Sequence, residues 1–178
     1  MVSMASGQLE FDNLDFDLIK DHQGLVDHIQ CINKALLIPI VGNIEYLKQE
    51  YKDLSYPVHT IALRDAYSHL AKIIGFDVIL TADGTIKNKI KRQLERYLGH
   101  LEELLYDTYL KIIKKKSDIL VERLSTEGRS IDIPKIKMKL APEVQKIRVV
   151  NDTATIVEKR VRYEKIISFI DNYYNTNY

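Results

Sequence analysis

A guanidinium, a carboxylate and an imidazole occur together in the hexapeptide RDAYSH at residues 64–69. The imidazole of His69 can take a proton from a ribose 2′-hydroxyl, or give one to a leaving 5′-oxygen, near neutral pH. The guanidinium of Arg64 can stabilise the charge that develops on phosphate oxygens. Asp65 lies four residues before His69, the spacing at which a carboxylate can hydrogen-bond an imidazole on a helix. These residue types predict cleavage of RNA that needs no metal and no cofactor.

The hexapeptide lies in an expected helix over residues 58–74, which Gly75 would end. The apolar residues of this helix predict its buried stripe: Leu63, Tyr67, Leu70 and Ile74 fall on one line of a helical wheel, with Ala66 and Ile73 beside them. Arg64 and His69 then leave opposite edges of the stripe, about 140° apart around the polar side. A second copy of the helix, related by a twofold axis, would bring one Arg64 near the other His69. The pattern therefore predicts a homodimer with composite sites.

The same six residues resemble the R-x4-6-H signature of the HEPN superfamily, in which a polar residue commonly follows the arginine. The resemblance implies an all-helical bundle, often dimeric, that cleaves RNA without metal in toxin–antitoxin, abortive-infection or CRISPR-linked defence. It assigns catalysis to Arg64 and His69 and a supporting role to Asp65, and it implies an antitoxin protein as a partner. One family branch has a tyrosine two places after the histidine, where this chain has Ala71.

The hexapeptide has an alternative interpretation as ordinary helix residues, and the chain has an alternative function that is not enzymatic. Arg64 and Asp65 are also typical of a solvated helix face, and His69 of a histidine at the edge of a core. The whole chain then fits a helical scaffold or interaction protein without catalytic activity, whose long amphipathic helices bind a protein partner.

Composition indicates a globular helical protein. Of 178 residues, 46% are hydrophobic and 29% charged, with only 7 glycines and 4 prolines to make turns. The single cysteine, Cys31, cannot form an internal disulfide, which is typical of a reducing compartment. No uninterrupted apolar run reaches 18 residues, so we expect no membrane association and a cytoplasmic location. We expect a single helical domain over residues 1–178.

The expected elements form an antiparallel bundle of four to five helices, two of them long. An acidic lead-in over residues 1–16 offers Asp12 or Asp15 as helix caps. A helix over 18–38 should end or kink at Pro39. The steps of three and four between apolar residues predict one continuous helix over 86–124, with a core face formed by Ile90, Leu94, Leu101, Leu105 and Ile112. A loop over 125–138 should follow, and Pro142 should open the last helix, with a strand over 146–157 as the alternative.

Charge is distributed unevenly along the chain. Residues 1–84 contain 6 basic and 12 acidic side chains, and residues 85–178 contain 20 and 13. The second half could contact a phosphate backbone, although solvated lysines on long helices give the same composition. The basic residues in question are Lys87, Lys89, Lys91, Arg92, Arg96, Lys111, Lys114, Lys115, Lys116, Lys159, Arg160 and Arg162. His22 and His28 are six residues apart and point to different helix faces, so they predict no metal site.

Overall fold

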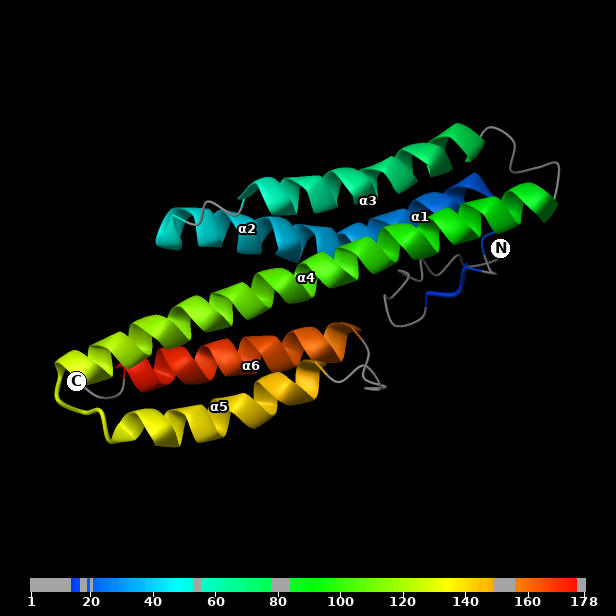
Figure 1. Ribbon diagram of the computed structural model, residues 1–178. Coiled ribbons are helices and arrows are strands. Elements are labelled where there is room, and N and C mark those ends of the chain that lie inside the picture. The colour runs from blue at the N-terminus through cyan, green and yellow to red at the C-terminus, as the bar shows by residue number, and fades with distance from the viewer. Residues whose placement is uncertain are drawn as a thin grey trace, which may run out of the picture. The chain divides into compact units, whose positions relative to one another are not determined.

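The computed structural model describes residues 14–16, 19, 21–52, 56–77, 84–148 and 156–175. Nearly all of these residues are helical, and none of them lies in a strand (Figure 1). In chain order the elements are α1 (His22–Ile32), the π-helix η3 (Asn33–Leu37), α2 (Ile38–Tyr51), α3 (Tyr56–Asp77), α4 (Gly84–Thr126), α5 (Asp132–Arg148) and α6 (Ile156–Asn175). The prediction of an all-α helical bundle is confirmed.

The helices belong to two compact units. The first unit consists of Met1–Ile44 and Leu54–Leu105, and so contains α1, η3, the start of α2, α3 and the first half of α4. The second consists of Glu45–Asp53 and Tyr106–Tyr178, with the end of α2, the second half of α4, α5 and α6. Because α2 and α4 contribute residues to both units, this division does not test the prediction of a single domain.

The chain enters α1 through a capped turn. The side chain of Asp21 accepts a hydrogen bond from the Gly24 amide at 2.8 Å and is the N-cap of α1. The helix therefore begins at His22 rather than near residue 18, and Asp15, one of the two expected caps, lies before it. Of the expected lead-in, residues 1–13, including Asp12, lie outside the described part of the chain.

Pro39 does not end the first helix, as one form of the prediction had it. A turn of π-helix, η3, ends two residues before Pro39, and the amide of Ile38 donates to the carbonyl of Asn33, five residues back. Proline has no amide hydrogen and its ring crowds the carbonyl four residues earlier. The wider turn relieves that conflict, so the helical path continues through Pro39 into α2.

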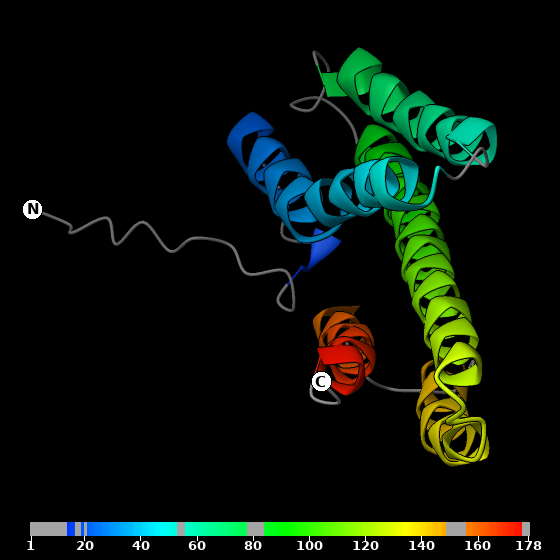
Figure 2. The same ribbon diagram turned by 90° about the vertical axis from the view of Figure 1, so that its left-hand side faces the viewer.

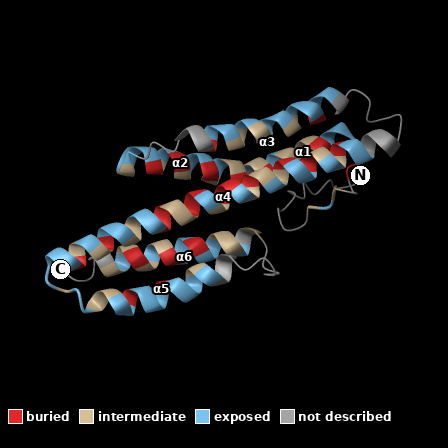
Figure 3. Ribbon diagram, viewed as in Figure 1, coloured by how far each residue is buried: buried red, intermediate tan, exposed pale blue. Residues whose placement is uncertain are grey.

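The long helix α4 is continuous over 43 residues. All five residues predicted for its core face are buried, as the buried positions along α4 in Figure 3 illustrate. The helix ends at a left-handed glycine, Gly128, with φ of 72°. The amide of Arg129 donates to the carbonyl of Leu124 at 2.8 Å, which is the closing bond of a Schellman motif. The prediction of one helix bounded by a turn at Gly128 is confirmed.

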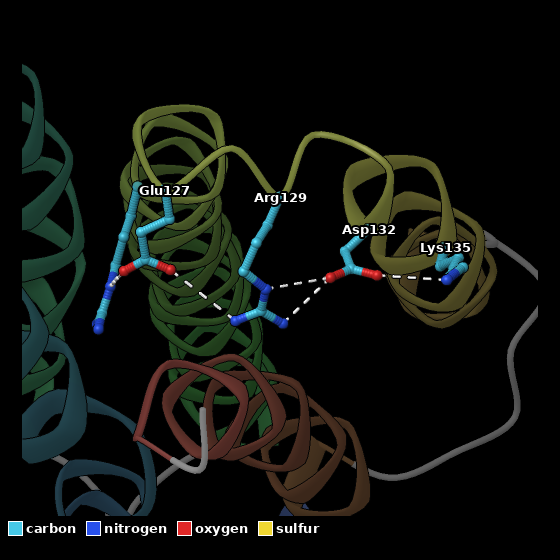
Figure 4. A network of polar contacts seen from close by, with 5 residues as sticks. Glu127, Arg129, Asp132 and Lys135 are labelled. Atoms are coloured by element: carbon cyan, nitrogen blue, oxygen red, sulfur yellow. Dashed lines mark hydrogen bonds and ion pairs between the residues drawn. The ribbon is translucent and has the colours of Figure 1, made fainter. Parts of the chain in front are cut away.

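The predicted loop over 125–138 is wrong, because α5 already begins at Asp132. Pro134 lies in the first turn of α5, where backbone amides have no partner within the helix and a missing one costs little. A chain of ion pairs holds this start in place (Figure 4). Arg129 contacts Asp132 at 3.1 Å and Glu127 at 3.9 Å, and Lys135 contacts Asp132 at 3.3 Å.

Pro142 lies inside α5 and does not open the last helix, which is a second correction. The carbonyl that a residue at 142 would bond belongs to Met138, and both residues are exposed, so water can reach that carbonyl. The last helix is α6, and it packs against α5. Residues 146–148 and 156–157 of the alternative strand are helical, and residues 149–155 lie outside the described part of the chain.

One helical stretch, His22–Tyr51, is long and apolar enough by length and composition to cross a membrane. Its mean hydropathy reaches 1.2, and 28% of the most apolar window is buried in the protein. An uninterrupted apolar run is a stricter criterion than an average over 18 residues, which tolerates single polar side chains. A core helix of a soluble protein passes the same test, and the cytoplasmic location stays a prediction.

Candidate functional site

Helix α3, which contains the hexapeptide, packs through only one edge of its predicted buried stripe, the edge with Ala66 and Ile73. Among the residues of α3 whose burial is described, His59, Ala66 and Ile73 are buried at a spacing of seven, whereas Tyr67 is 45% exposed and Ile74 is 62% exposed. Tyrosine has an apolar ring and a hydroxyl, so it suits the edge of an interface as well as a core. The helix also runs through the expected stop at Gly75 to Asp77. The prediction that Tyr67 and Ile74 lie in the buried stripe is wrong.

Arg64 and Asp65 pair with each other. The guanidinium of Arg64 donates to the Asp65 carboxylate at 3.0 and 3.2 Å, and the Arg64 side chain is 73% exposed. Exposed pairs of this kind contribute little to stability. The expected bond from Asp65 to the His69 ring is not formed, because the carboxylate faces its neighbour instead. The Asp65 carboxylate is thus paired with Arg64 and not with His69.

His69 faces α4. Its Nδ1 lies 2.7 Å from the amide oxygen of Gln93. Because that oxygen only accepts, Nδ1 carries the hydrogen and donates it, and in the neutral ring Nε2 is left as the proton acceptor. The ring also stacks on that of His100, with centroids 5.2 Å apart and planes inclined by 14°. Both histidines are half-buried.

The two histidines border a shallow depression of about 340 Å³ in the first unit. Its lining comes from α3 and α4 and consists of His69, Arg96, Gly99, His100 and Glu103. The contacts of His69 with Gln93 and His100 place α3 beside the first half of α4, and Figure 2 shows these two helices next to each other. The structure thus unites His69 with an arginine of α4 and not with the arginine of its own hexapeptide.

The α4 residues form a polar stripe with steps of three, four and three: Gln93, Arg96, His100 and Glu103. This spacing puts them on one face of the helix. Arg96 and Glu103 are exposed, and neither forms an ion pair or hydrogen bond within the described ranges. Their charges are therefore available to a ligand.

Chemically, the depression combines two imidazoles with an unpaired guanidinium. Such a pair can provide a proton acceptor and a proton donor near neutral pH, while the guanidinium binds an oxyanion. Because the rings are nearly parallel, their nitrogens lie at separate points, as an acid and a base that act on two different oxygens require. Among the residues whose placement is described, no three His, Cys, Asp or Glu side chains gather to hold a metal ion.

Three of the α4 residues at this site were not predicted from the sequence: Gln93, His100 and Glu103. Arg96 was included there only as part of a basic surface. The signal that could have found them is the polar stripe itself. This stripe runs beside the apolar stripe of α4. A face that is fully solvated has no need of polar residues at such a regular repeat.

Comparison of the chain with protein-family models, curated proteins and solved structures found no match. The resemblance to the HEPN superfamily therefore still rests on the hexapeptide and the helical architecture alone.

Proposed function

We propose that this protein is a metal-independent endoribonuclease whose reaction centre is the stacked pair His69 and His100 beside Arg96. The observation that carries the proposal is the parallel stack itself, 5.2 Å between ring centroids, at the border of an open depression that contains an unpaired guanidinium. General acid–base catalysis requires two such groups within reach of one phosphodiester.

In the proposed reaction, Nε2 of His69 takes the proton from a ribose 2′-hydroxyl. The 2′-oxygen forms a bond to phosphorus, and the bond from phosphorus to the 5′-oxygen breaks. His100 in its protonated form gives a proton to that leaving oxygen. The guanidinium of Arg96 stabilises the charge on the non-bridging oxygens. The products are a 2′,3′-cyclic phosphate and a 5′-hydroxyl end.

Arg64 has a different part in this proposal from the one the hexapeptide suggested. Its exposed guanidinium lies about 140° around α3 from His69, so it cannot act on the same phosphate within one chain. In a homodimer it could reach the depression of the second copy. The homodimer, the antitoxin partner and a role in phage defence follow from the resemblance and the α3 geometry, and they are proposed on those grounds.

The test is cleavage of end-labelled RNA in the presence of EDTA. His69→Ala and His100→Ala should each lower the rate at least about a hundredfold, the usual contribution of one acid–base group. Both side chains are half-buried, so circular dichroism and a thermal melt must accompany the rates to establish that the variants are folded. His22→Ala, at an exposed histidine in α1, is the matched control and should cleave like the wild type. Cleavage that requires Mg²⁺, or that survives both substitutions, would contradict the proposal.

A second candidate function is binding of a helix from a protein partner, and a groove in the second unit favours it. The groove measures about 770 Å³ and is lined mainly by apolar side chains of α4 and α5, including Ile113, Leu140 and Val144. An amphipathic helix binds such a groove through its apolar face. Val144→Asp should then abolish binding of a protein that copurifies with the wild type and leave RNA cleavage unchanged. Retained binding by this variant would exclude the groove.

A further inference from the structure

The depression has opposite charges at its two ends. Arg96 and Glu103 are seven residues apart on α4, which corresponds to about 10 Å along the helix axis. Each lacks a partner among the described side chains, and His100 lies between them along the stripe, with the ring of His69 stacked on it. A simple anion site would gain nothing from Glu103, because a carboxylate repels phosphate. The ligand must offer an anion at one end and hydrogen-bond donors at the other.

The side of the depression toward the start of α4 is the basic one. Lys89 and Arg92 are exposed and precede Arg96 at steps of three and four residues, which puts all three on one side of α4. A row of cations that leads to Arg96 fits successive phosphates of a single strand. The base attached to the bound phosphate would then extend toward Glu103.

Gly99 leaves room for a flat ring. A Cβ built on Gly99 would have no atom within 4 Å, and the residue lines the depression between Arg96 and His100. Histidine rings and guanidinium planes are both surfaces on which splayed-out RNA bases stack. The geometry thus accommodates one nucleotide, with its base against the His100 side and its edge near the carboxylate.

We propose, on the basis of the proposed ribonuclease function, that the depression binds one nucleotide of single-stranded RNA and that Glu103 selects guanine. The N1–H and the N2 amino group of guanine are adjacent parallel donors, which a single carboxylate accepts through both oxygens. Adenine and cytosine present one amino group on the corresponding edge. Uracil presents a single N–H flanked by two carbonyl oxygens, which the carboxylate repels. The expected order of preference is guanine, then adenine and cytosine, then uracil.

The test measures binding apart from cleavage. Fluorescein-labelled hexamers of 2′-O-methyluridine, each with one of the four bases at its third position, cannot be cut because the 2′-oxygen is blocked. We expect fluorescence anisotropy to give a dissociation constant roughly tenfold lower for the guanine hexamer than for the all-uridine hexamer, as one bidentate base contact provides. Glu103→Gln should bring the four hexamers to within about twofold of one another.

Two further variants make the result specific. Glu95→Gln removes an exposed carboxylate of α4 that does not line the depression, and it should keep the guanine preference. Arg96→Gln should weaken the binding of all four hexamers by a similar factor, because the proposed partner of Arg96 is a phosphate and not a base. Equal binding of the four hexamers by the wild type, or a guanine preference that persists in Glu103→Gln, would overturn the proposal.

The outcomes also separate this proposal from the proposed function. Cleavage in EDTA with no base preference would leave the ribonuclease standing and overturn the role of Glu103. A guanine preference lost in Glu103→Gln, without any cleavage, would support the nucleotide site and remove the catalytic proposal. A protein that binds none of the hexamers but cleaves RNA in EDTA would overturn the nucleotide site and leave the ribonuclease standing.

Discussion

Replacing Gly99 separates the needs of the fold from those of the depression. A glycine inside a helix lowers the stability of the fold by about 0.5–1 kcal/mol relative to alanine, because glycine loses more conformational freedom when the chain folds. Gly99 is an exposed position inside α4, and an added Cβ would meet nothing within 4 Å. Gly99→Ala should therefore raise the free energy of unfolding by about 0.5–1 kcal/mol. For a chain of this length the melting temperature should rise by about 1–4 °C.

Gly42 is a matched control for this substitution. It is also an exposed residue within a helix, α2, with nothing within 4 Å of an added Cβ, and it is not part of the depression. Gly42→Ala should give the same stabilisation in urea unfolding followed by circular dichroism. RNA binding by Gly42→Ala should equal that of the wild type.

A longer side chain at residue 99 tests the depression. Glutamine is a good helix former, so Gly99→Gln should keep most of the stabilisation while its side chain occupies the space for a base. Base stacking on a protein contributes about 1 kcal/mol or more, so RNA binding should weaken by roughly fivefold or more. A stabilised Gly99→Gln that binds RNA like the wild type would refute the location of the site. A Gly99→Ala variant that is less stable than the wild type would refute the reasoning about the helix.

Two other substitutions test contacts within single units. Tyr97→Phe removes the hydroxyl that donates to Asn33 Oδ1 at 2.6 Å, and it should lower the free energy of unfolding by about 1–2 kcal/mol. Burial raises the pKa of Tyr97 to about 12, so the native hydroxyl keeps its hydrogen throughout the neutral range. An urea-unfolding change of a few tenths of a kcal/mol would contradict the importance of this bond. Asp132→Asn tests the start of α5, where hydrogen bonds from Lys135 and Arg129 lower the pKa of Asp132 below its ordinary value of 3.8. A carboxyl group with a lowered pKa stabilises the folded state at pH values above its ordinary pKa. The difference in unfolding free energy between wild type and variant should therefore be full near pH 7 and should shrink as the pH falls below about 4. A difference that grows in acid would have the wrong sign for this network.

The long helix was predictable because its pattern is local and redundant. Apolar residues such as Ile90, Leu94 and Leu101 recur at steps of three and four, and every one of the predicted core positions of α4 is buried. The start of α5 was not predictable in this way, because glycine and proline, here Gly128 and Pro134, are both common in loops. Only the cap at Gly128 and the first-turn position of Pro134 show that the loop between the helices is short.

The orientation of α3 depends on what covers it. Residues 63–74 contain apolar side chains on two adjoining lines, and a helical wheel cannot say which line meets the neighbouring helices. The packed line contains Ala66 and Ile73, while Tyr67 lies at its exposed edge. A small residue such as alanine allows close approach of a second helix, whereas a tyrosine at the edge keeps its hydroxyl near polar groups.

The candidate site was half predictable for a related reason. His69 could be chosen from its own helix, but its partners follow 24 and 31 residues later, on α4. No spacing within the hexapeptide contains that information, and the arginine of the hexapeptide, Arg64, pairs with Asp65 instead. What the sequence does contain is a second stripe on α4, made of polar and titratable residues and parallel to the apolar one. A solvated face tolerates such residues in any order, whereas a face that meets a neighbouring helix must repeat every three or four residues to stay in contact with it. A regular polar stripe beside an apolar stripe therefore indicates where a histidine on another helix can find its partners.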